Sequence, residues 1–231
     1  MVLNLRLREA LRATPRASIV RIELNGAEFD YQAGQSVLVG TPGAARRPYS
    51  IAASPQETRR NDYIELLVGV GANGTPGPHL KLEPGSEVDV EGPVGSFRFP
   101  SDPTERRFVF IAGGTGIAPL RAMLRHALTL RGHRIGLYYS ARTPEDFAYE
   151  AEFRTLAEQG RIELRQTVTR AVDGEWSGTR GRISRAELQG LVHDPATLCF
   201  ICGPPTLVSE MSNELAALGV ERSLIRSEEW A

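Results

Sequence analysis

The chain of 231 residues has little of what several protein classes require. Its two cysteines are too few for an iron-sulfur cluster, which normally takes four protein ligands. Its net charge of -1 excludes a strong field that would attract nucleic acid or an anionic membrane. No uncharged apolar run reaches the roughly 18 residues that cross a bilayer, and residues 1–12 alternate leucine with arginine instead of forming a signal-peptide core. These absences predict a cytoplasmic globular protein without nucleic-acid or membrane partners.

The two cysteines, Cys199 and Cys202, have the spacing of a redox dithiol or of half a zinc site. Both lie in the apolar run 197–202, which is typical of a buried strand. Residues three apart on a strand point to opposite faces, so a disulfide or a shared metal is not expected. We therefore predict no metal site.

The first part of the chain, up to about residue 100, consists of short extended stretches separated by glycine and proline. Residues 18–24 alternate in polarity, and the β-type runs 36–39, 63–70 and 87–90 follow. Little amphipathic helix lies between them. This pattern predicts an all-β antiparallel barrel domain.

In the second part of the chain, from Arg107 onward, strands alternate with helices. The expected strands are 108–112, 135–139, 162–168, 198–202 and 223–225. The expected helices are 117–128, 144–158, one that begins at Ser184, and 205–218. This repetition predicts an α/β doubly wound parallel sheet that binds a nucleotide. With a polar boundary at 100–106, the domains are expected to be 1–100 and 101–231.

A glycine-rich segment, 113–119, lies between the first of these strands and its helix, with the sequence Gly-Gly-Thr-Gly-Ile-Ala-Pro. Residues without large side chains let the backbone approach a phosphate, and the helix N-terminus supplies N–H groups and partial positive charge. The segment lacks the Gly-Lys-Ser/Thr of a Walker loop, and Pro119 replaces the last glycine of a G-x-G-x-x-G motif. A plain structural turn is the alternative, but the setting favours phosphate binding.

Two weaker motifs carry further chemistry. In the barrel, residues 47–50 read Arg-Pro-Tyr-Ser, in which arginine can bind phosphate, tyrosine can pack on a ring system and serine can hydrogen-bond to a ring nitrogen. Taken alone, this is more simply the end of a strand. Residues 202–205, Cys-Gly-Pro-Pro, lead from a strand into a helix, where doubly wound folds bind ligands. A buried inert cysteine explains that motif equally well.

The combination of these motifs, in this order and followed by an acidic-aromatic C-terminus, resembles the ferredoxin-NADP reductase superfamily over nearly the whole chain. The resemblance implies a stand-alone flavoprotein reductase without an iron-sulfur domain. It also implies FAD as the flavin and NADP or NAD as the nicotinamide cofactor.

In the barrel, the resemblance implies that Arg47 binds a flavin phosphate, Tyr49 packs on the isoalloxazine and Ser50 hydrogen-bonds near flavin N5. The other residues implied to bind the flavin are Pro48, Leu67, Val68, Gly69, Gly74, Thr75 and Gly77. Gly77 stands where the family has a serine, and Thr75 is the candidate substitute. This departure leaves FMN open as an alternative to FAD.

In the second domain, the resemblance implies a nicotinamide site. The residues implied to bind the dinucleotide are Gly114, Thr115, Gly116 and Pro119. Cys202 and Gly203 would face the nicotinamide, and Glu228 would be a proton or hydrogen-bond partner near the flavin. Trp230 would shield the flavin ring, although Ala231 extends the chain one residue beyond the family's usual aromatic end.

The choice between NADP and NAD depends on charge, because NADP sites bind the 2'-phosphate with arginine. The second strand ends at Ser140 and Arg142, and Arg170 and Arg180 follow later, at positions that resemble the family's NADP-binding cluster. These residues favour NADPH. Because 26 of the 27 basic residues are arginine, solvated surface arginines are the alternative.

The predicted activity is hydride transfer from NAD(P)H to bound FAD. Electrons would then pass to a separate ferredoxin, flavodoxin or oxygenase component, or to a small acceptor, because the chain has no cluster of its own. Two alternatives remain open: a free flavin reductase that uses flavin as substrate, and a non-catalytic nucleotide-binding subunit. The predicted catalytic residues are Ser50, Cys202 and Glu228.

Overall fold

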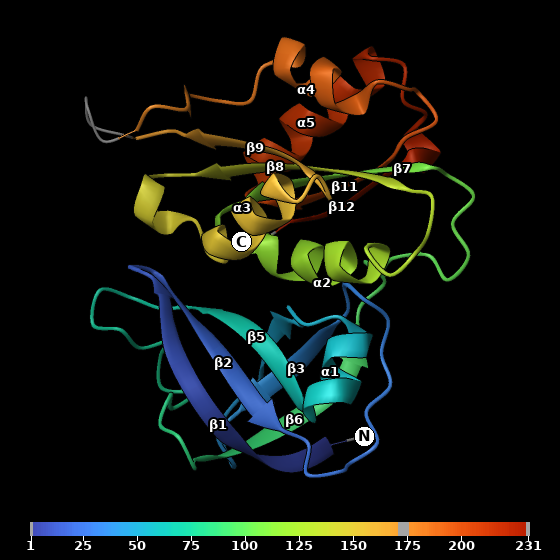
Figure 1. The fold of residues 1–231 in the computed structure, drawn as a ribbon. Helices are drawn as coiled ribbons and strands as arrows, with labels where there is room; N and C mark the ends of the chain where they lie inside the picture. The colour runs from blue at the N-terminus through green and yellow to red at the C-terminus, as the bar shows by residue number, and fades with distance from the viewer. Residues whose placement is uncertain (1, 171–175, 230–231) are drawn as a thin grey trace. The chain divides into compact units, whose positions relative to one another are not determined.

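The computed structural model describes residues 2–170 and 176–229. The chain forms two compact units (Figure 1). Unit 1 comprises Met1–Phe99 and Arg121–His126, and unit 2 comprises Pro100–Leu120 and Ala127–Ala231.

Unit 1 contains an antiparallel sheet of six strands in the order β4-β3-β6-β1-β2-β5 (Figure 1). The strands are β1 (Val2–Thr14), β2 (Ala17–Glu23), β3 (Ser36–Gly40), β4 (Arg47–Ser50), β5 (Tyr63–Gly69) and β6 (Glu87–Val94). A bridge between Ile51 and Leu66, with a 2.7 Å hydrogen bond from Ala52 N–H to the Glu65 carbonyl, joins β5 to the chain that leaves β4. The two edges therefore meet, and the predicted barrel is confirmed.

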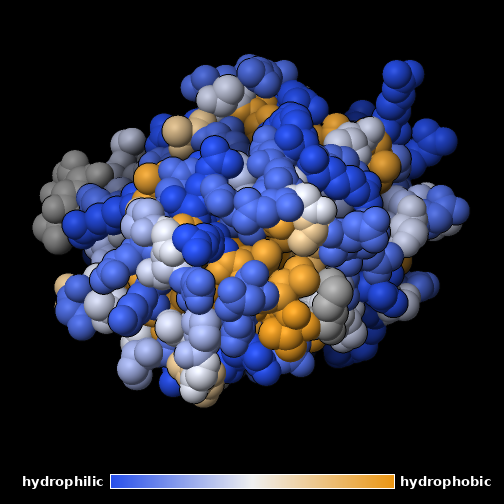
Figure 2. All heavy atoms as spheres, turned by 90° about the horizontal axis from the view of Figure 1, so that it is seen from below, coloured by the Kyte–Doolittle hydropathy of each residue, from blue (hydrophilic) through white to orange (hydrophobic). Residues whose placement is uncertain are grey.

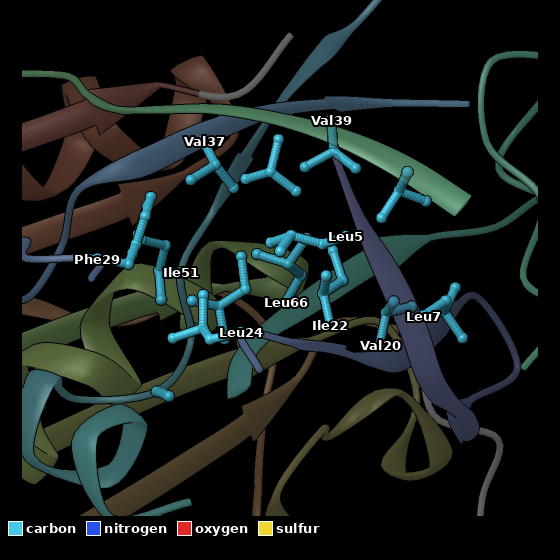
Figure 3. Packing of buried hydrophobic residues seen from close by; sticks show 14 of the residues in the cluster. Leu5, Leu7, Val20, Ile22, Leu24, Phe29, Val37, Val39, Ile51 and Leu66 are labelled. Carbon is cyan, nitrogen blue, oxygen red and sulfur yellow. The ribbon is translucent and has the colours of Figure 1, made fainter. Parts of the chain in front are cut away.

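The barrel core follows from the period-2 alternation of its strands. Figure 3 shows Val20 and Ile22 of β2, Leu66 of β5 and Val37 of β3 in one cluster, and all four are fully buried. Alternate side chains of a strand point to the same face, so each strand contributes every second residue to this cluster. The pattern at 18–24 therefore identified inward residues correctly.

Two elements of unit 1 were not predicted from the sequence. Strand β1 includes the alternation of leucine with arginine at the N-terminus, and it buries Leu5 and Leu7 in the barrel. Helix α1 (Pro55–Asn61) interrupts a region expected to hold only strands. It is short, so it has too few turns to show helical periodicity, but its capping box and its proline in the first turn are readable signals.

Unit 2 contains a parallel sheet of six strands in the order β10-β9-β8-β7-β11-β12 (Figure 1). The strands are β7 (Arg107–Gly113), β8 (Arg134–Ala141), β9 (Glu163–Val168), β10 (Thr179–Arg180), β11 (Leu198–Gly203) and β12 (Ile225–Glu229). The helices of the second half are α2 (Ile117–Ala127), α3 (Glu150–Glu158), α4 (Arg185–Val192) and α5 (Pro205–Ala217). Helices α4 and α5 cover one face of the sheet and α3 lies on the other, which confirms the doubly wound α/β fold (Figure 1).

The core of unit 2 separates the two cysteines of strand β11. Cys199 and Ile201 belong to the cluster under α4 and α5, whereas Phe200 stacks on Phe110 at a centroid distance of 5.4 Å. Cys202 is buried but is not part of the Cys199 cluster. The opposite orientation expected from their spacing is therefore present.

Two expected elements of unit 2 have different bounds. The helix predicted over 144–158 is divided into a short 3-10 turn (Pro144–Asp146) and α3, because Tyr149 between them has φ +59. Of the strand predicted at 223–225, the first two residues lie in a 3-10 turn (Arg222–Leu224), and Ile225 begins β12, which continues to Glu229. Strand β12 is polar and forms through its parallel pairing with β11, which local apolar pattern does not reveal.

The described surface carries few large apolar side chains. Val2 and Leu11, both on β1, are the exposed large hydrophobic residues in the described ranges. One face of the molecule shows mainly hydrophilic residues around a small hydrophobic group (Figure 2). No helix within the described ranges has the length and apolar character needed to cross a membrane.

Candidate functional site

In unit 2, the carboxyl ends of β7, β11 and β12 lie side by side. The register pairs Cys202 with Ala112 of β7 on one side and with Glu228 of β12 on the other. Strand β7 ends at Gly113, and the glycine-rich segment continues as a 3-10 turn (Gly114–Gly116) that leads directly into α2. Two of the three predicted catalytic residues, Cys202 and Glu228, therefore meet at the edge that carries the predicted phosphate loop.

Gly116 makes the closest approach in this region. A Cβ atom at this position would lie 2.3 Å from the Cys202 carbonyl oxygen, so only glycine allows the loop to pass over the end of β11. Apart from the loop's own neighbouring residues, no described atom lies within 4 Å of the corresponding Cβ position at Gly114, so the loop is open on that side. Thr115 lies between them, and Pro119 is in the first turn of α2. An open glycine loop at a helix N-terminus fits a pyrophosphate.

Tyr139 supports this loop and was not predicted as a site residue. It is fully buried at the end of β8, and its hydroxyl donates a 3.1 Å hydrogen bond to the Gly114 carbonyl and accepts one of 3.2 Å from Ala148 N–H. Burial raises the pKa of the phenol, so it stays a neutral donor. The sequence identifies Tyr139 only as an apolar strand residue, because no local pattern reports where a buried hydroxyl points.

Glu228 has the electrostatics expected of a group that holds or transfers a proton. Its side chain is partly buried, and Oε2 is buried without a hydrogen-bond partner among the described residues. Desolvation raises the pKa of this carboxyl to about 7. Such a shift, in a residue beside Cys202, is typical of functional carboxyls. Gly203 ends β11 next to this pair, and Trp230 lies outside the described residues.

Three exposed arginines lie on the same carboxyl edge, farther along the sheet. Arg142 and Arg170 follow β8 and β9, and a 2.7 Å hydrogen bond joins Arg170 N–H to the Arg142 carbonyl. Arg180 pairs with Val168 at the end of β9 and donates to the Trp176 carbonyl at 3.0 Å. Ser140 is mostly buried within β8. The parallel sheet therefore brings together the three arginines that the sequence separates.

In unit 1, strand β4 carries the Arg-Pro-Tyr-Ser motif. Arg47 and Pro48 are exposed, and Tyr49 is half-buried. Ser50 is buried, with its Oγ atom 3.1 Å from that of Ser36 on the neighbouring strand. The motif thus offers a cation, an aromatic ring and a hydroxyl along one strand.

The barrel closure brings this motif near the other residues predicted to bind flavin. The Ile51–Leu66 bridge sets the end of β4 beside Leu67 and Val68, which are buried, and Gly69 is exposed at the end of β5. Of the predicted loop residues, Gly74 closes a turn in which its N–H donates to the Gly71 carbonyl at 2.9 Å, and Thr75 and Gly77 follow in irregular chain. The Thr75 hydroxyl donates to Asn73 Oδ1 at 3.0 Å.

Family models and individual relatives match this chain. A model described as oxidoreductase FAD-binding domain matches residues 4–99, and one described as oxidoreductase NAD-binding domain matches residues 110–213. Ferredoxin-NADP reductase B of Sorangium cellulosum (strain So ce56) is 37% identical, with 89% of this chain and 88% of that protein aligned. Oxidoreductase NAD-binding domain-containing protein 1 of Danio rerio is 30% identical, with 91% of this chain and 85% of that protein aligned.

Solved structures share the fold. A ferredoxin NADP+ reductase from Neisseria gonorrhoeae with bound FAD and NADP superposes with a TM-score of 0.80 at 20% identity, covering 99% of this chain and 98% of that one. The ferredoxin reductase in carbazole 1,9a-dioxygenase gives a TM-score of 0.83 at 22% identity, covering 100% and 70%. At these identities the likeness concerns the fold alone.

Proposed function

The chain belongs to the ferredoxin-NADP reductase superfamily and is an NAD(P)H-dependent flavoprotein reductase, and we propose that it passes electrons from NADPH through FAD to a separate one-electron acceptor protein. One observation in the fold carries the proposal: Cys202, Glu228 and the open loop at Gly114 share the carboxyl edge of the parallel sheet. We assign FAD to residues 1–100 and the nicotinamide nucleotide to residues 101–231.

When bound, the cofactors would supply the chemistry, which is hydride transfer from the nicotinamide to the flavin. The residues proposed to hold FAD are Arg47, Pro48, Tyr49, Ser50, Leu67, Val68, Gly69, Gly74, Thr75, Gly77 and Trp230. The residues proposed to hold the nucleotide are Gly114, Thr115, Gly116, Pro119, Ser140, Arg142, Arg170, Arg180, Cys202 and Gly203.

The chain's own residues position the reactants and handle a proton. Ser50 offers a buried hydroxyl for a hydrogen bond to the flavin edge. Glu228, with a pKa near 7, can keep or release a proton at neutral pH. Cys202 is proposed to border the nicotinamide, where a small and neutral side chain permits close approach. Ser50 and Cys202 are thus proposed to position the reactants, which lowers the activation barrier of hydride transfer by alignment. Glu228 is proposed to exchange a proton.

We propose NADPH as the preferred donor. Arg142, Arg170 and Arg180 are exposed and lie at the ends of consecutive strands. A cluster of guanidinium groups attracts a phosphate monoester more strongly than it attracts a ribose hydroxyl. The 2'-phosphate distinguishes NADPH from NADH, so this cluster supports the choice.

We propose a ferredoxin, a flavodoxin or an oxygenase component as the acceptor. The similar Sorangium protein, 37% identical to this chain, is named a ferredoxin-NADP reductase, which supports an acceptor of this kind. The two cysteines of the given sequence are too few to ligate an iron-sulfur cluster, which supports a one-electron centre outside these residues as the acceptor.

The test is the visible spectrum of the purified protein before and after anaerobic addition of NADPH or NADH. We expect a bound flavin spectrum that bleaches faster with NADPH. A protein that is colourless and does not retain added FAD, yet reduces free flavin, would be a free flavin reductase. A protein that binds flavin but bleaches with neither donor would be a non-catalytic binding subunit.

A further inference from the structure

His79, which follows the predicted flavin-binding residues Gly74, Thr75 and Gly77, contacts the tyrosine of the Arg-Pro-Tyr-Ser motif. His79 Nε2 lies 2.6 Å from Tyr49 Oη, and the two rings are nearly parallel, at 13° with centroids 6.0 Å apart. His79 is 5% exposed, whereas Tyr49 is half-buried. The pair therefore consists of a buried imidazole in contact with the hydroxyl of a partly accessible phenol.

The surroundings favour the neutral form of both groups. Burial, followed by the charge of Arg47, lowers the pKa of His79, and burial raises the pKa of Tyr49 although Arg47 opposes that rise. In a neutral pair the phenol O–H is the stronger donor. We therefore assign Tyr49 Oη–H as donor and His79 Nε2 as acceptor, with the imidazole proton on Nδ1.

The contact with Tyr49 is the hydrogen bond of the His79 ring among the described residues. Nδ1 is buried and has no hydrogen-bond partner among the described residues. It faces Gly77, where a Cβ atom would stand 3.4 Å away and where φ is +113. A buried unpaired nitrogen costs stability, so a histidine that only filled space would be replaced favourably by an apolar side chain. The imidazole thus occupies the space beside position 77.

We propose that His79 is a positioning residue for the flavin, and that it acts by holding the phenol of Tyr49. The inference rests on the proposed function, in which Tyr49 packs on the isoalloxazine. The bond fixes the tilt of the tyrosine ring and adds electron density to it, because the phenol donates toward the imidazole. An electron-rich ring packs best on the electron-poor oxidised flavin, so His79 favours the oxidised state of the bound cofactor.

The experiment compares His79→Phe, His79→Gln, Tyr49→Phe and the double variant Tyr49→Phe/His79→Phe. Phenylalanine keeps a ring and removes Nε2, whereas glutamine restores an acceptor for the phenol. The readouts are the dissociation constant of FAD from the apoprotein, measured by flavin fluorescence, and the two-electron potential. His126→Gln is the matched control, because His126 is a histidine of unit 1 that contacts Gln56 instead of Tyr49.

We expect His79→Phe to weaken binding of oxidised FAD about tenfold and to raise the potential by up to about 30 mV, the equivalent of that factor for a two-electron couple. His79→Gln should recover most of the loss, and the double variant should match Tyr49→Phe alone. Equal effects of His79→Phe in the wild-type and Tyr49→Phe backgrounds would overturn the inference, as would an unchanged potential.

FAD binding by the wild-type protein tests the proposed function independently of the role of His79. Wild-type protein that binds no FAD refutes the proposed function and, with it, the role of His79. Wild-type protein that binds FAD, with His79 variants that match it, refutes only the role of His79. If His79→Phe does not fold, the dissociation constants of FAD from His79→Gln and Tyr49→Phe are compared instead. FAD binding by His79→Gln that is as weak as binding by Tyr49→Phe would count against the inference.

Discussion

Single buried hydroxyl groups position both candidate sites. Tyr139 bonds to the Gly114 carbonyl in unit 2, and Ser50 pairs with Ser36 in unit 1. A net contribution of about 1 kcal/mol per buried hydrogen bond is typical, so each can be removed without unfolding the chain. Substitutions that remove one hydroxyl oxygen can therefore change activity while the protein stays folded.

Tyr139→Phe should raise the KM for NADPH about threefold to tenfold with little change in kcat, because the loop at Gly114 loses its support while the aromatic packing remains. Steady-state kinetics measure both constants. Tyr138→Phe is the control: Tyr138 is the preceding residue, is equally buried and shares a hydrogen bond with Glu187. An equal rise of KM in both variants would contradict the role of Tyr139.

Ser50→Ala should slow flavin reduction by about tenfold while FAD stays bound, because one hydrogen bond near the reacting edge is lost. Stopped-flow absorbance after mixing with NADPH measures the rate. Ser36→Ala removes the neighbouring hydroxyl and should change the rate much less. A rate in Ser50→Ala that equals the wild-type rate would remove its proposed role.

Arg170→Ala should raise the KM for NADPH at least about tenfold and that for NADH less than about twofold, because a lost charge-assisted contact affects only the 2'-phosphate. Parallel titrations with both donors provide the comparison. Arg182→Ala is the control, because Arg182 forms an ion pair with Glu210. Equal effects on both donors would count against NADPH specificity.

At the level of elements, two helices begin with the same capping box in different surroundings. Helix α1 uses Ser54 and Glu57, and α4 uses Ser184 and Glu187. Ser54 is buried, whereas Ser184 is exposed. Burial alone would raise the pKa of Glu57, but Arg121, hydrogen bonds from Ser54 and Arg125 together lower it. The cap of α1 is thus part of a charged network, and that of α4 stands at the surface.

Ser54→Ala should lower the free energy of unfolding by about 2 kcal/mol and Ser184→Ala by about 0.5 to 1 kcal/mol, because only the first leaves polar groups buried and unpaired. Urea unfolding monitored by circular dichroism gives both values. The two substitutions are chemically identical, so each is the control for the other. Equal losses would show that burial of the cap adds nothing.

At the scale of the whole molecule, stability should depend on the ionisation of Glu228. Its pKa in the folded state, about 7, is above the ordinary value of 4.5. The stabilisation from the protonated form is therefore complete below pH 4.5 and is lost as pH rises through 7. A partly exposed carboxyl is screened by solvent, so we expect a loss of about 1 kcal/mol between pH 5 and 8.

Glu228→Gln should abolish this loss, because the amide does not ionise. Thermal unfolding between pH 5 and 8 measures it, and Glu229→Gln serves as control since Glu229 is the exposed neighbour on β12. A pH dependence that persists in Glu228→Gln would show that another group is responsible.

Local pattern was sufficient for most of the fold. The apolar run 108–112 identified a strand because a strand that is buried on both faces is apolar at every position. The alternation at 18–24 identified another because a strand that is buried on one face is apolar at every second position. Polar β12 left no such trace, since its hydrogen bonds come from β11. Helix α1 is too short to show a period, although its cap was readable.

Residue types and their order along the chain were enough to indicate two domains, a flavin and a nicotinamide nucleotide. Only the tertiary structure decided that Glu228 lies beside Cys202, that Tyr139 supports the Gly114 loop and that His79 holds Tyr49. The physical reason is that backbone preference and hydrophobic periodicity act over a few residues. The direction of a buried polar side chain depends instead on strands and loops that are distant in sequence.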